Sequence, residues 1–283
     1  MSNMRFVRFP LVLLVFSSIF VFSQGWNCGT ITTAGDINII KQILSGITKK
    51  YDYTTLPCIN KTLSLTVYIV RDSLGKTNID KSIIQEAVDS LNNKFKPICL
   101  SFKICEFIEI HNFQYDTISK DKYEYKEVIT KYYKPNTINI YFVKEIITPN
   151  SVCGFAPYPP SKDYIFLKKK CIIDESINNK FITFQHMMGH YLGLLHTFEV
   201  PLGFTDQSDC STTGDLICDT EADPNAGFTD CGYASTIKDA HGDFYLIPTD
   251  NFMSYYVTCM CRFSNDQYRL MSEIYFKMRN YLW

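Results

Sequence analysis

The sequence has almost no excess of charge of either sign. Its 28 Lys and Arg residues balance 29 Asp and Glu residues, which leaves a formal net charge of −1. Nucleic-acid binders rely on a positive field to attract phosphates, so this balance argues against a nucleic-acid partner. Hydrophobic residues make up 46% of the chain, which is enough apolar material for a packed core and excludes intrinsic disorder.

Long hydrophobic runs are also scarce. The most apolar stretch, residues 11–22, has 12 residues and follows Arg5 and Arg8 without an acidic residue. A membrane-spanning helix needs about 20 apolar residues, so the stretch fits a secretory signal better than a membrane anchor. We predict a signal peptide at 1–23, a secreted, periplasmic or extracellular protein, and no membrane contact after the signal is removed.

Cysteine, in contrast, is abundant. Eleven cysteines are many for 283 residues and favour an oxidising compartment with disulfides. Because the number is odd, at least one cysteine is unpaired within the chain, removed by processing or used for another purpose.

The order of predicted elements indicates a mixed α/β unit followed by a loop-rich, disulfide-rich unit. Period-two alternation predicts a strand at 63–70, and helical spacing of apolar residues predicts a helix at about 80–95 with Asp80 as its cap. Ser264 with Gln267 forms a capping box that opens the last helix. The polar stretch 111–134, rich in Lys and Tyr, is predicted to be a surface excursion. Further strands are expected at 98–107, 137–143 and 163–167, and further helices at 36–47, 181–195 and 264–282.

Three of the five histidines lie within eleven residues. His186 and His190 are four residues apart, so on a helix they share one face. Gly193 ends the helix by taking a left-handed turn, and His196 then returns as a third ligand. Three imidazoles with an open fourth position are typical of a catalytic Zn²⁺ site. The remaining histidines, His111 and His241, are isolated and are interpreted as ordinary residues.

Two segments resemble the metzincin metallopeptidases. Residues 186–198, HMMGHYLGLLHTF, resemble the zinc-binding signature of these enzymes in the form used by the pappalysins. Residues 251–255, NFMSY, resemble their Met-turn, a loop beneath the metal. The resemblance implies an α+β metzincin fold, with an upper mixed α/β subdomain (63–196) that carries a twisted sheet and the active-site helix. The lower, irregular, disulfide-rich subdomain (197–283) then carries the Met-turn and the C-terminal helix.

The resemblance also implies a function, that of a secreted, monomeric zinc metalloendopeptidase that takes an extended peptide or protein substrate in the cleft between the subdomains. Met253 is then a hydrophobic floor beneath the ligands. Tyr255 is predicted to stabilise the oxyanion, with a purely structural buried aromatic as the alternative.

One departure from the pattern affects the chemistry. The family has a glutamate directly after the first histidine, where this chain has Met187. That glutamate takes a proton from the metal-bound water, and a thioether has no such capacity. A positioned general base contributes roughly 10²–10⁴ in rate, so we expect an intact zinc site with greatly weakened or absent peptide hydrolysis.

Three explanations of Met187 remain open. The protein is a catalytically dead pseudopeptidase that binds peptides or proteins, or an enzyme in which another carboxylate serves, or the product of a laboratory substitution. Glu199 is the nearest carboxylate in sequence, but at three residues past the last ligand it is expected to be out of reach of the water.

The leader, residues 24–62, contains a second candidate ligand. Cys28-Gly29-Thr30 resembles a stretch in bacterial pappalysins in which a cysteine thiolate caps the zinc of a zymogen. If so, the leader is a pro-segment; the alternative is a disulfide between Cys28 and Cys58.

The lower subdomain prompts two further predictions. The resemblance suggests a disulfide between Cys231 and Cys259. A dense set of carboxylates is a candidate Ca²⁺ site, because hard oxygen ligands suit that ion; a solvated acidic loop is the alternative. The carboxylates are Asp206, Asp209, Asp215, Asp219 and Asp223.

Overall fold

The computed structural model describes residues 27–47, 55–119, 124–149, 151–173, 181–199, 209–225, 236–239, 241–256 and 259–282. The predicted signal peptide lies outside these ranges. Within them, no helix is both long enough and apolar enough to cross a bilayer.

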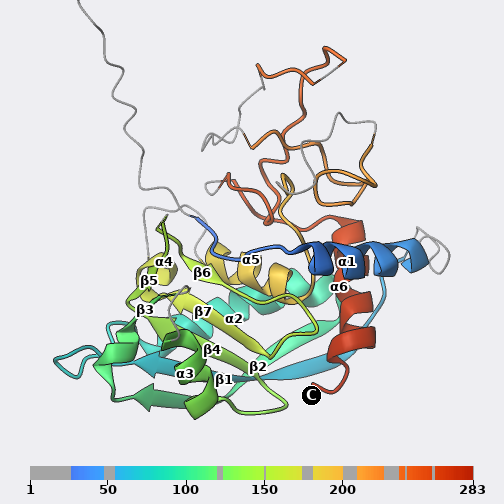
Figure 1. The fold of residues 1–283 in the computed structure, drawn as a ribbon. Coiled ribbons are helices and arrows are strands. Elements are labelled where there is room, and N and C mark those ends of the chain that lie inside the picture. Colours follow the sequence, from blue (N-terminus) through green and yellow to red (C-terminus); the bar gives the residue numbers. More distant parts are fainter. Residues whose placement is uncertain are drawn as a thin grey trace, which may run out of the picture.

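A five-stranded sheet forms the base of the molecule (Figure 1). Its strand order is β2 (Leu100–Ile110), β1 (Lys61–Val70), β4 (Ile138–Val143), β7 (Tyr164–Lys168) and β6 (Gly154–Phe155). The first four strands are parallel, and the short β6 runs antiparallel to β7 at one edge. Strand β4 has the sequence INIYFV and is buried along its whole length, as expected for an inner parallel strand with both faces covered.

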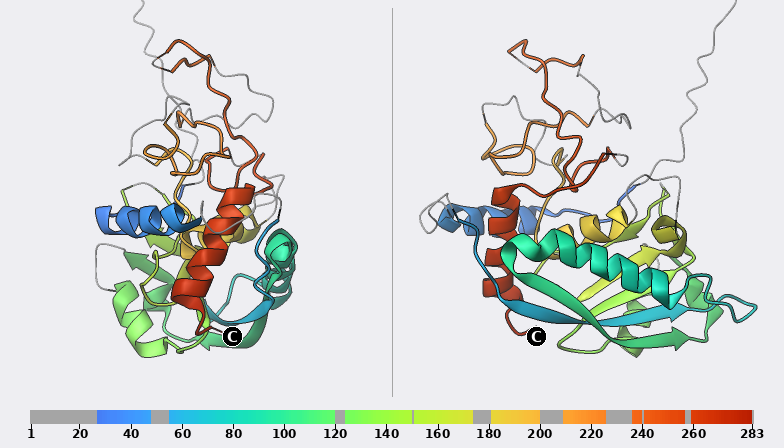
Figure 2. Two further views of the ribbon diagram at one scale, coloured as in Figure 1. Left: turned by 90° about the vertical axis from the view of Figure 1, so that its right-hand side faces the viewer. Right: turned by 180° about the vertical axis from the view of Figure 1, so that it is seen from behind.

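Two apolar clusters lie on opposite faces of this sheet. Leu65, Val67 and Ile69 of β1 pack into the larger cluster with helices α2 (Lys81–Phe95) and α5 (Ile182–Tyr191). The alternate β1 residues Tyr68 and Val70 belong to the smaller cluster, because successive side chains of a strand point to opposite faces. Figure 2 shows the sheet with helices on both of its sides.

The smaller cluster corrects the prediction of a surface excursion at 111–134. This stretch holds strand β3 (Thr117–Ser119) and helix α3 (Glu124–Tyr132), and β3 pairs with β5 (Glu145–Ile147). Ile118 and Val128 are fully buried against the sheet. The prediction was wrong because the few apolar residues that become buried are separated by many Lys and Tyr residues, which leaves no clear helical or strand pattern in the sequence.

Two helices from opposite ends of the chain pack against each other beside the sheet (Figure 1). They are α1 (Ala34–Ile47) and α6 (Asn265–Ile274), the latter followed by a π-helical turn, Tyr275–Arg279. The predicted capping box is present: the Gln267 amide donates to Ser264 Oγ, and the Ser264 amide donates to Gln267 Oε1. At α2 the prediction was wrong in detail, because Asp80 occupies the cap position without a side-chain hydrogen bond.

Three disulfides are present among the described residues: Cys58–Cys99, Cys153–Cys171 and Cys210–Cys218. The first excludes the alternative bond between Cys28 and Cys58. Cys259 is also disulfide-bonded, but its predicted partner Cys231 lies outside the described residues, so that pairing stays a prediction.

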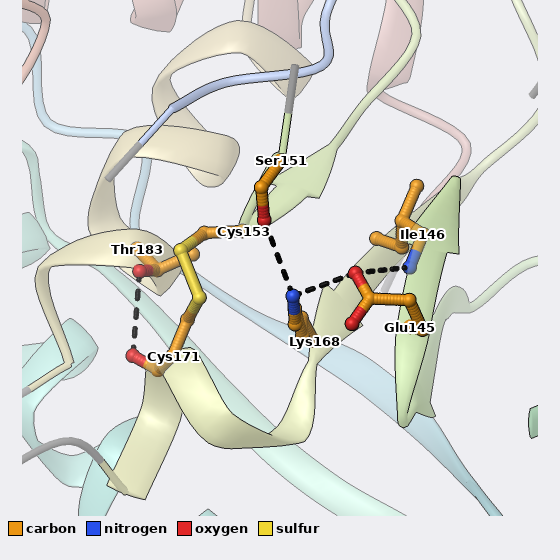
Figure 3. Close-up of a disulfide and its surroundings, with 7 residues drawn as sticks. All are labelled: Glu145, Ile146, Ser151, Cys153, Lys168, Cys171 and Thr183. Carbon is orange, nitrogen blue, oxygen red and sulfur yellow. Dashed lines mark hydrogen bonds and ion pairs between the residues drawn. A yellow bond between two sulfur atoms is a disulfide. The ribbon is translucent and has the colours of Figure 1, made fainter. Parts of the chain in front are cut away.

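The second disulfide positions the edge of the sheet next to the active-site helix (Figure 3). Cys153 directly precedes β6, and Cys171 lies in the short helix α4 (Lys169–Ile173) after β7. Lys168 forms an ion pair with Glu145 at 2.6 Å. The hydroxyl of Thr183, in the first turn of α5, donates to the Cys171 carbonyl at 3.5 Å. Helix α4 is therefore linked both to the residue before β6 and to the first turn of α5, which holds β6 and α5 next to each other.

Candidate active site

Helix α5 places His186 and His190 one turn apart, and both side chains are fully buried. The helix ends at Tyr191, four residues earlier than predicted, because the chain turns at Gly193 with φ of +90°. A Cβ at Gly193 would come within 2.8 Å of Ile274, so both the backbone angle and the available space require glycine. The turn returns His196 to the cluster, where it is 6% exposed.

The three histidines point their Nε2 atoms at one another. The Nε2 atom of His190 lies 3.0 Å from that of His186 and 3.1 Å from that of His196. Ligand nitrogens around a tetrahedral zinc ion, with bonds of about 2.0–2.1 Å, lie roughly 3.3 Å apart. The observed spacing is therefore close to that of a metal-bound trio.

The opposite ring nitrogens fix the tautomers. The Nδ1 atom of His186 lies 2.6 Å from the Phe252 carbonyl oxygen, and that of His190 lies 2.8 Å from the Leu194 carbonyl oxygen. Carbonyl oxygens only accept, so both Nδ1 atoms carry a proton and both Nε2 atoms present lone pairs. Lone pairs facing each other at this distance repel unless a cation lies between them. The donor set thus fits a bound metal ion.

The pKa values of the histidines also favour a bound cation. Burial lowers the pKa of His186 to about 4, which keeps this ring neutral. Burial also lowers the pKa of His196, but hydrogen bonding and charge from Cys28 and Glu199 outweigh it and raise the pKa to about 9. The two anionic groups therefore attract positive charge to the cluster, as a proton or as a metal ion.

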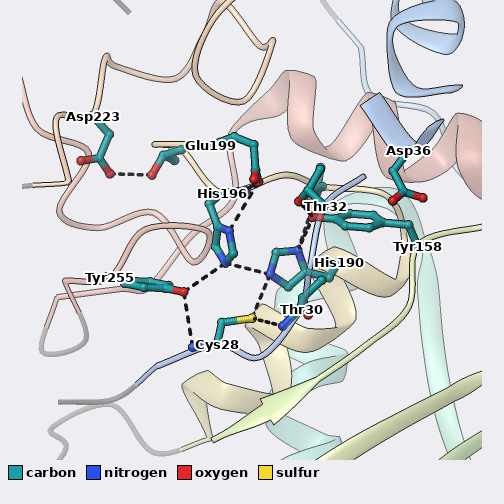
Figure 4. Close-up of polar contacts among 12 residues, drawn as sticks. Cys28, Thr30, Thr32, Asp36, Tyr158, His190, His196, Glu199, Asp223 and Tyr255 are labelled. Atoms are coloured by element: carbon teal, nitrogen blue, oxygen red, sulfur yellow. Dashed lines mark hydrogen bonds and ion pairs between the residues drawn. The ribbon is translucent and has the colours of Figure 1, made fainter. Parts of the chain in front are cut away.

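Cys28 reaches the cluster from the leader (Figure 4). Its Sγ lies 3.3 Å from His190 Nε2, and the ligand atoms of the four residues all lie within 4.8 Å of one another. Burial raises the pKa of the Cys28 thiol, but the imidazoles of His190 and His186 outweigh burial and lower the pKa well below 9.0. A thiolate is a strong zinc ligand, so Cys28 is placed to take the fourth position.

The segment predicted to be the Met-turn packs against helix α5. Met253 is fully buried, and its Sδ would be only 2.5 Å from a Cβ at Gly189, so it packs directly against the helix between the two ligands. The hydroxyl of Tyr255 lies 3.5 Å from His196 Nε2 and accepts from the Cys28 amide at 3.4 Å. Burial, followed by the charge of Cys28, raises the pKa of Tyr255, so its hydroxyl is protonated.

Met187, which is predicted to stand at the position of the general base, is fully buried. A Cβ at Gly154 of strand β6 would lie 3.3 Å from Met187 Cγ, and the Thr30 hydroxyl lies 4.0 Å from Met187 Sδ. The side chain therefore fills the space between the active-site helix, the edge strand and the leader.

Glu199 lies on the outer side of His196. Its Oε2 is 3.5 Å from His196 Nδ1 and accepts from the His196 amide at 3.2 Å. It thus faces away from the Nε2 cluster, which agrees with the expectation that it is out of reach of a metal-bound water. Its contact with the His196 ring was not anticipated from the sequence.

Tyr158 is a second neighbour that sequence reasoning missed. Its hydroxyl lies 3.1 Å from His190 Nδ1 and 3.1 Å from the Thr32 hydroxyl of the leader. The ring is 3% exposed. No local motif marks this tyrosine, since its contact with His190 depends on how strand β6 packs on helix α5.

The candidate calcium site finds no support. Asp215 accepts from Thr220 and Asp223 accepts from Thr197. Asp219 accepts from Ser264 and from the amide of Asp266. Among the described residues, His, Cys, Asp and Glu side chains converge as a potential metal site at Cys28, His186, His190 and His196, and the Asp residues form no such group. Asp206 lies outside the described residues.

Comparisons with known proteins agree with this geometry. The family described as Pregnancy-associated plasma protein-A, of the M43 peptidases, matches residues 120–275, or 156 of 283 residues. An extracellular metalloprotease of Arthroderma gypseum is 26% identical over 288 residues, which span 96% of this chain and 90% of the relative. An extracellular metalloprotease of Neurospora crassa is 24% identical over 267 residues, spanning 90% and 89%.

A solved structure shows the same fold. Mature mirolysin of Tannerella forsythia, in complex with a cleaved peptide, aligns with a TM-score of 0.56 at 18% identity. The alignment covers 78% of this chain and 91% of mirolysin. The chain therefore belongs to the Pregnancy-associated plasma protein-A, or pappalysin, family of metallopeptidases and has the metzincin fold.

Proposed function

We propose that this protein is a secreted, zinc-binding pappalysin whose peptide hydrolysis is weak or absent. The observation that carries the proposal is the contrast between three converging imidazoles and a fully buried Met187 beside them. The proposal includes the signal peptide at 1–23 and the subdomain limits 63–196 and 197–283. We propose zinc alone as the metal, because the carboxylates considered for Ca²⁺ accept hydrogen bonds from neighbouring hydroxyl groups instead.

The roles of the chain's own residues follow from their positions. His186, His190 and His196 hold the ion, which when bound supplies a Lewis acid for a peptide carbonyl. Tyr255 presents a protonated hydroxyl 3.5 Å from His196 Nε2, where it donates to developing negative charge. Neither the Met187 thioether nor Glu199, which faces outward, accepts the proton that hydrolysis must move.

The substrate class is an extended peptide or protein segment. Strand β6 is the last strand of the sheet, and the leader already pairs with it: the Gly29 amide donates to the Gly154 carbonyl at 2.8 Å. A peptide that replaced the leader would gain the same main-chain hydrogen bonds by adding a strand to this edge.

A non-catalytic peptide- or protein-binding role is the second candidate. The complete burial of Met187 favours it, because the place where a base would meet water is filled by an apolar side chain. The binding edge and the metal do not depend on that base.

Cleavage of unfolded casein by Met187→Glu separates these functions. Because Cys28 is placed to fill the fourth position, the substitution is made both alone and together with Cys28→Ala, and each protein is compared with its Met187 counterpart. We expect chelator-sensitive cleavage in the double variant and little in Cys28→Ala alone. Adding His190→Ala to the double variant is the control, and it should abolish the gain. Robust chelator-sensitive cleavage by Cys28→Ala, equal to that of the double variant, would contradict the proposal.

A further inference from the structure

A buried ion pair joins the start of strand β7 to the segment after helix α6. Asp163 directly precedes β7, and Arg279 ends the π-helical turn that follows α6. The Nη1 of Arg279 donates to Asp163 Oδ1 at 2.5 Å, and the two side chains are 0% and 3% exposed. Burying two charges is costly, and apolar residues in place of such pairs are often as stable. Stability alone therefore gives little reason for this pair, which favours a positional role.

The carboxylate of Asp163 also binds the last residue of α5. Tyr191 donates its hydroxyl to Asp163 Oδ1 at 2.5 Å, and Tyr281 donates to the same oxygen at 2.9 Å. Burial raises the pKa of Tyr191 well above its usual range, so this hydroxyl keeps its proton and acts as the donor. Since Tyr191 directly follows His190, Asp163 holds the end of the helix one residue away from a proposed metal ligand.

The guanidinium of Arg279 connects the end of α5 to a second segment. Its Nη1 donates to the Ser161 carbonyl at 2.9 Å, its Nη2 donates to the Tyr191 carbonyl at 3.5 Å, and its central carbon lies 4.0 Å from the centroid of the Tyr191 ring. The Ser161 amide closes a turn by donating to the Tyr158 carbonyl at 3.1 Å. The hydroxyl of Tyr158 contacts His190 Nδ1 at 3.1 Å (Figure 4). Two neighbours of His190, one in sequence and one in space, are therefore linked to Arg279.

The helix before Arg279 also contacts the turn between the second and third histidines. A Cβ at Gly193 would lie 2.8 Å from Ile274, and Ile274 is the last residue of α6, directly before the π-helical turn. One continuous element thus contacts the chain at Tyr191 and again at Gly193. Single π-helical turns are frequent at functional sites, and this one carries the guanidinium that reaches Tyr191.

We propose that Arg279, paired with Asp163, is a positioning residue of the metal site. It holds the end of α5 against the turn at 158–161, and so keeps the His190 ring in the orientation in which Nδ1 meets its partners and Nε2 faces the other two histidines. Arg279 is not itself a ligand and acts through Tyr191 and the turn. This proposal rests on the three-histidine metal site of the proposed function.

A second buried ion pair provides a matched control. Lys169 Nζ lies 2.7 Å from Asp116 Oδ1, and these side chains are 4% and 5% exposed. Lys169 also donates to the Val70 carbonyl of β1, and Asp116 accepts from the Lys144 amide after β4. Breaking this pair should cost stability in the same way, but the pair joins strand ends rather than α5 and the turn. It therefore separates the loss of a buried ion pair from the loss of positioning.

Zinc affinity of the full chain, measured by competition with a chelator, tests the proposal. We expect Arg279→Met to bind zinc roughly ten-fold more weakly, as for the loss of an outer partner of a ligand. Arg279→Lys keeps the charge but lacks the planar fork that serves two carbonyls, so we expect a smaller loss. Lys169→Met should keep the zinc affinity of the parent, even though it should unfold at a lower urea concentration.

The geometry of the site is measured on the same proteins with cobalt(II) in place of zinc. The visible bands of cobalt depend on its coordination geometry, so we expect them to shift in both Arg279 variants and to match the parent in Lys169→Met. Far-ultraviolet circular dichroism shows which variants are folded. If Arg279→Met is unfolded, Arg279→Lys carries the test, because it leaves a positive charge beside Asp163.

The outcomes separate this proposal from the metal site itself. Unchanged zinc affinity and an unchanged cobalt spectrum in the folded Arg279 variants would overturn the positioning role. An equal loss of zinc affinity in Lys169→Met would also overturn it, because any buried ion pair would then have the same effect. A parent protein that binds neither zinc nor cobalt would instead overturn the proposed metal site, and this proposal with it.

Discussion

The two sides of helix α5 at the metal cluster differ in chemistry. On the side of the Met-turn, His186 is anchored by the Phe252 carbonyl and Gly189 packs on Met253. On the side of strand β6, Met187 lies against Gly154 and the leader. Under the proposed function, the first side provides the metal ligands, whereas the second side lacks the general base that peptide hydrolysis needs. We therefore expect metal binding and peptide hydrolysis to be separable properties of one helix.

Removing a metal ligand should have the largest effect of the changes predicted here, because it acts directly on metal binding. His190→Ala removes the ring whose Nε2 lies nearest to both neighbours, so we expect near-complete loss of bound zinc, measured by atomic emission on protein purified without chelator. His241→Ala, at an exposed histidine, is the matched control and should keep its zinc. Full zinc occupancy in His190→Ala would contradict the ligand assignment.

Gly193→Ala should destabilise the turn that returns His196. A left-handed backbone costs roughly 1–2 kcal/mol for a non-glycine residue, and the collision with Ile274 adds to it, so we expect a loss of about 2–4 kcal/mol in unfolding free energy. Gly75→Ala isolates the backbone contribution, because Gly75 has φ of +77° and no neighbour near its Cβ position. Urea unfolding of both variants measures the difference, and equal losses would show that packing on Ile274 is unimportant.

The carboxyl of Asp215 should make the stability of the folded protein sensitive to pH. Burial raises its pKa from 3.8 to about 7, despite hydrogen bonds from Thr220 and Gln267. The folded protein therefore holds this proton in a range where the unfolded chain has lost it. Its contribution to stability is present below pH 4, is lost as the pH rises from about 4 to about 7, and is constant above.

Asp215→Asn removes that titration. We expect its unfolding free energy, compared with the parent at each pH, to improve progressively from pH 4 to pH 7. Asp209→Asn, an exposed carboxylate of the same loop, serves as the control. A constant difference between Asp215→Asn and the parent across this range would show that Asp215 does not titrate there.

The smallest effect is expected at Tyr158. Tyr158→Phe removes the hydroxyl that contacts His190 Nδ1, but the Leu194 carbonyl still accepts from that nitrogen. Loss of an outer partner of a ligand typically costs 10–100-fold in metal affinity, so with one partner left we expect about ten-fold or less. Competition with a chelator measures this affinity. An unchanged affinity would leave Tyr158 with a packing role only.

The convergence of His186, His190 and His196 could be predicted because it is specified by residues close together in the sequence. The spacing of His186 and His190 depends only on helical geometry, and the turn at Gly193 needs no distant contact. The capping box at Ser264 is local in the same sense and was also found. Such features are specified within one or two turns of chain.

The features that the sequence did not reveal depend on contacts between residues that are far apart in the sequence. Cys58 bonds to Cys99 because β1 and β2 align Lys61 with Leu100, a parallel register that no local pattern specifies. Tyr158 meets His190 only after β6 has packed on α5. The family resemblance led us to consider Cys28 as a metal ligand, but the competing disulfide could be excluded only from the fold.

Zinc content and casein cleavage, measured on one preparation of the unaltered protein, test the central claim most directly. An intact metal site beside an apolar base position predicts close to one zinc per chain and little or no chelator-sensitive cleavage. Less than half an equivalent of zinc would contradict the metal site, and rapid chelator-sensitive cleavage would contradict the role given to Met187.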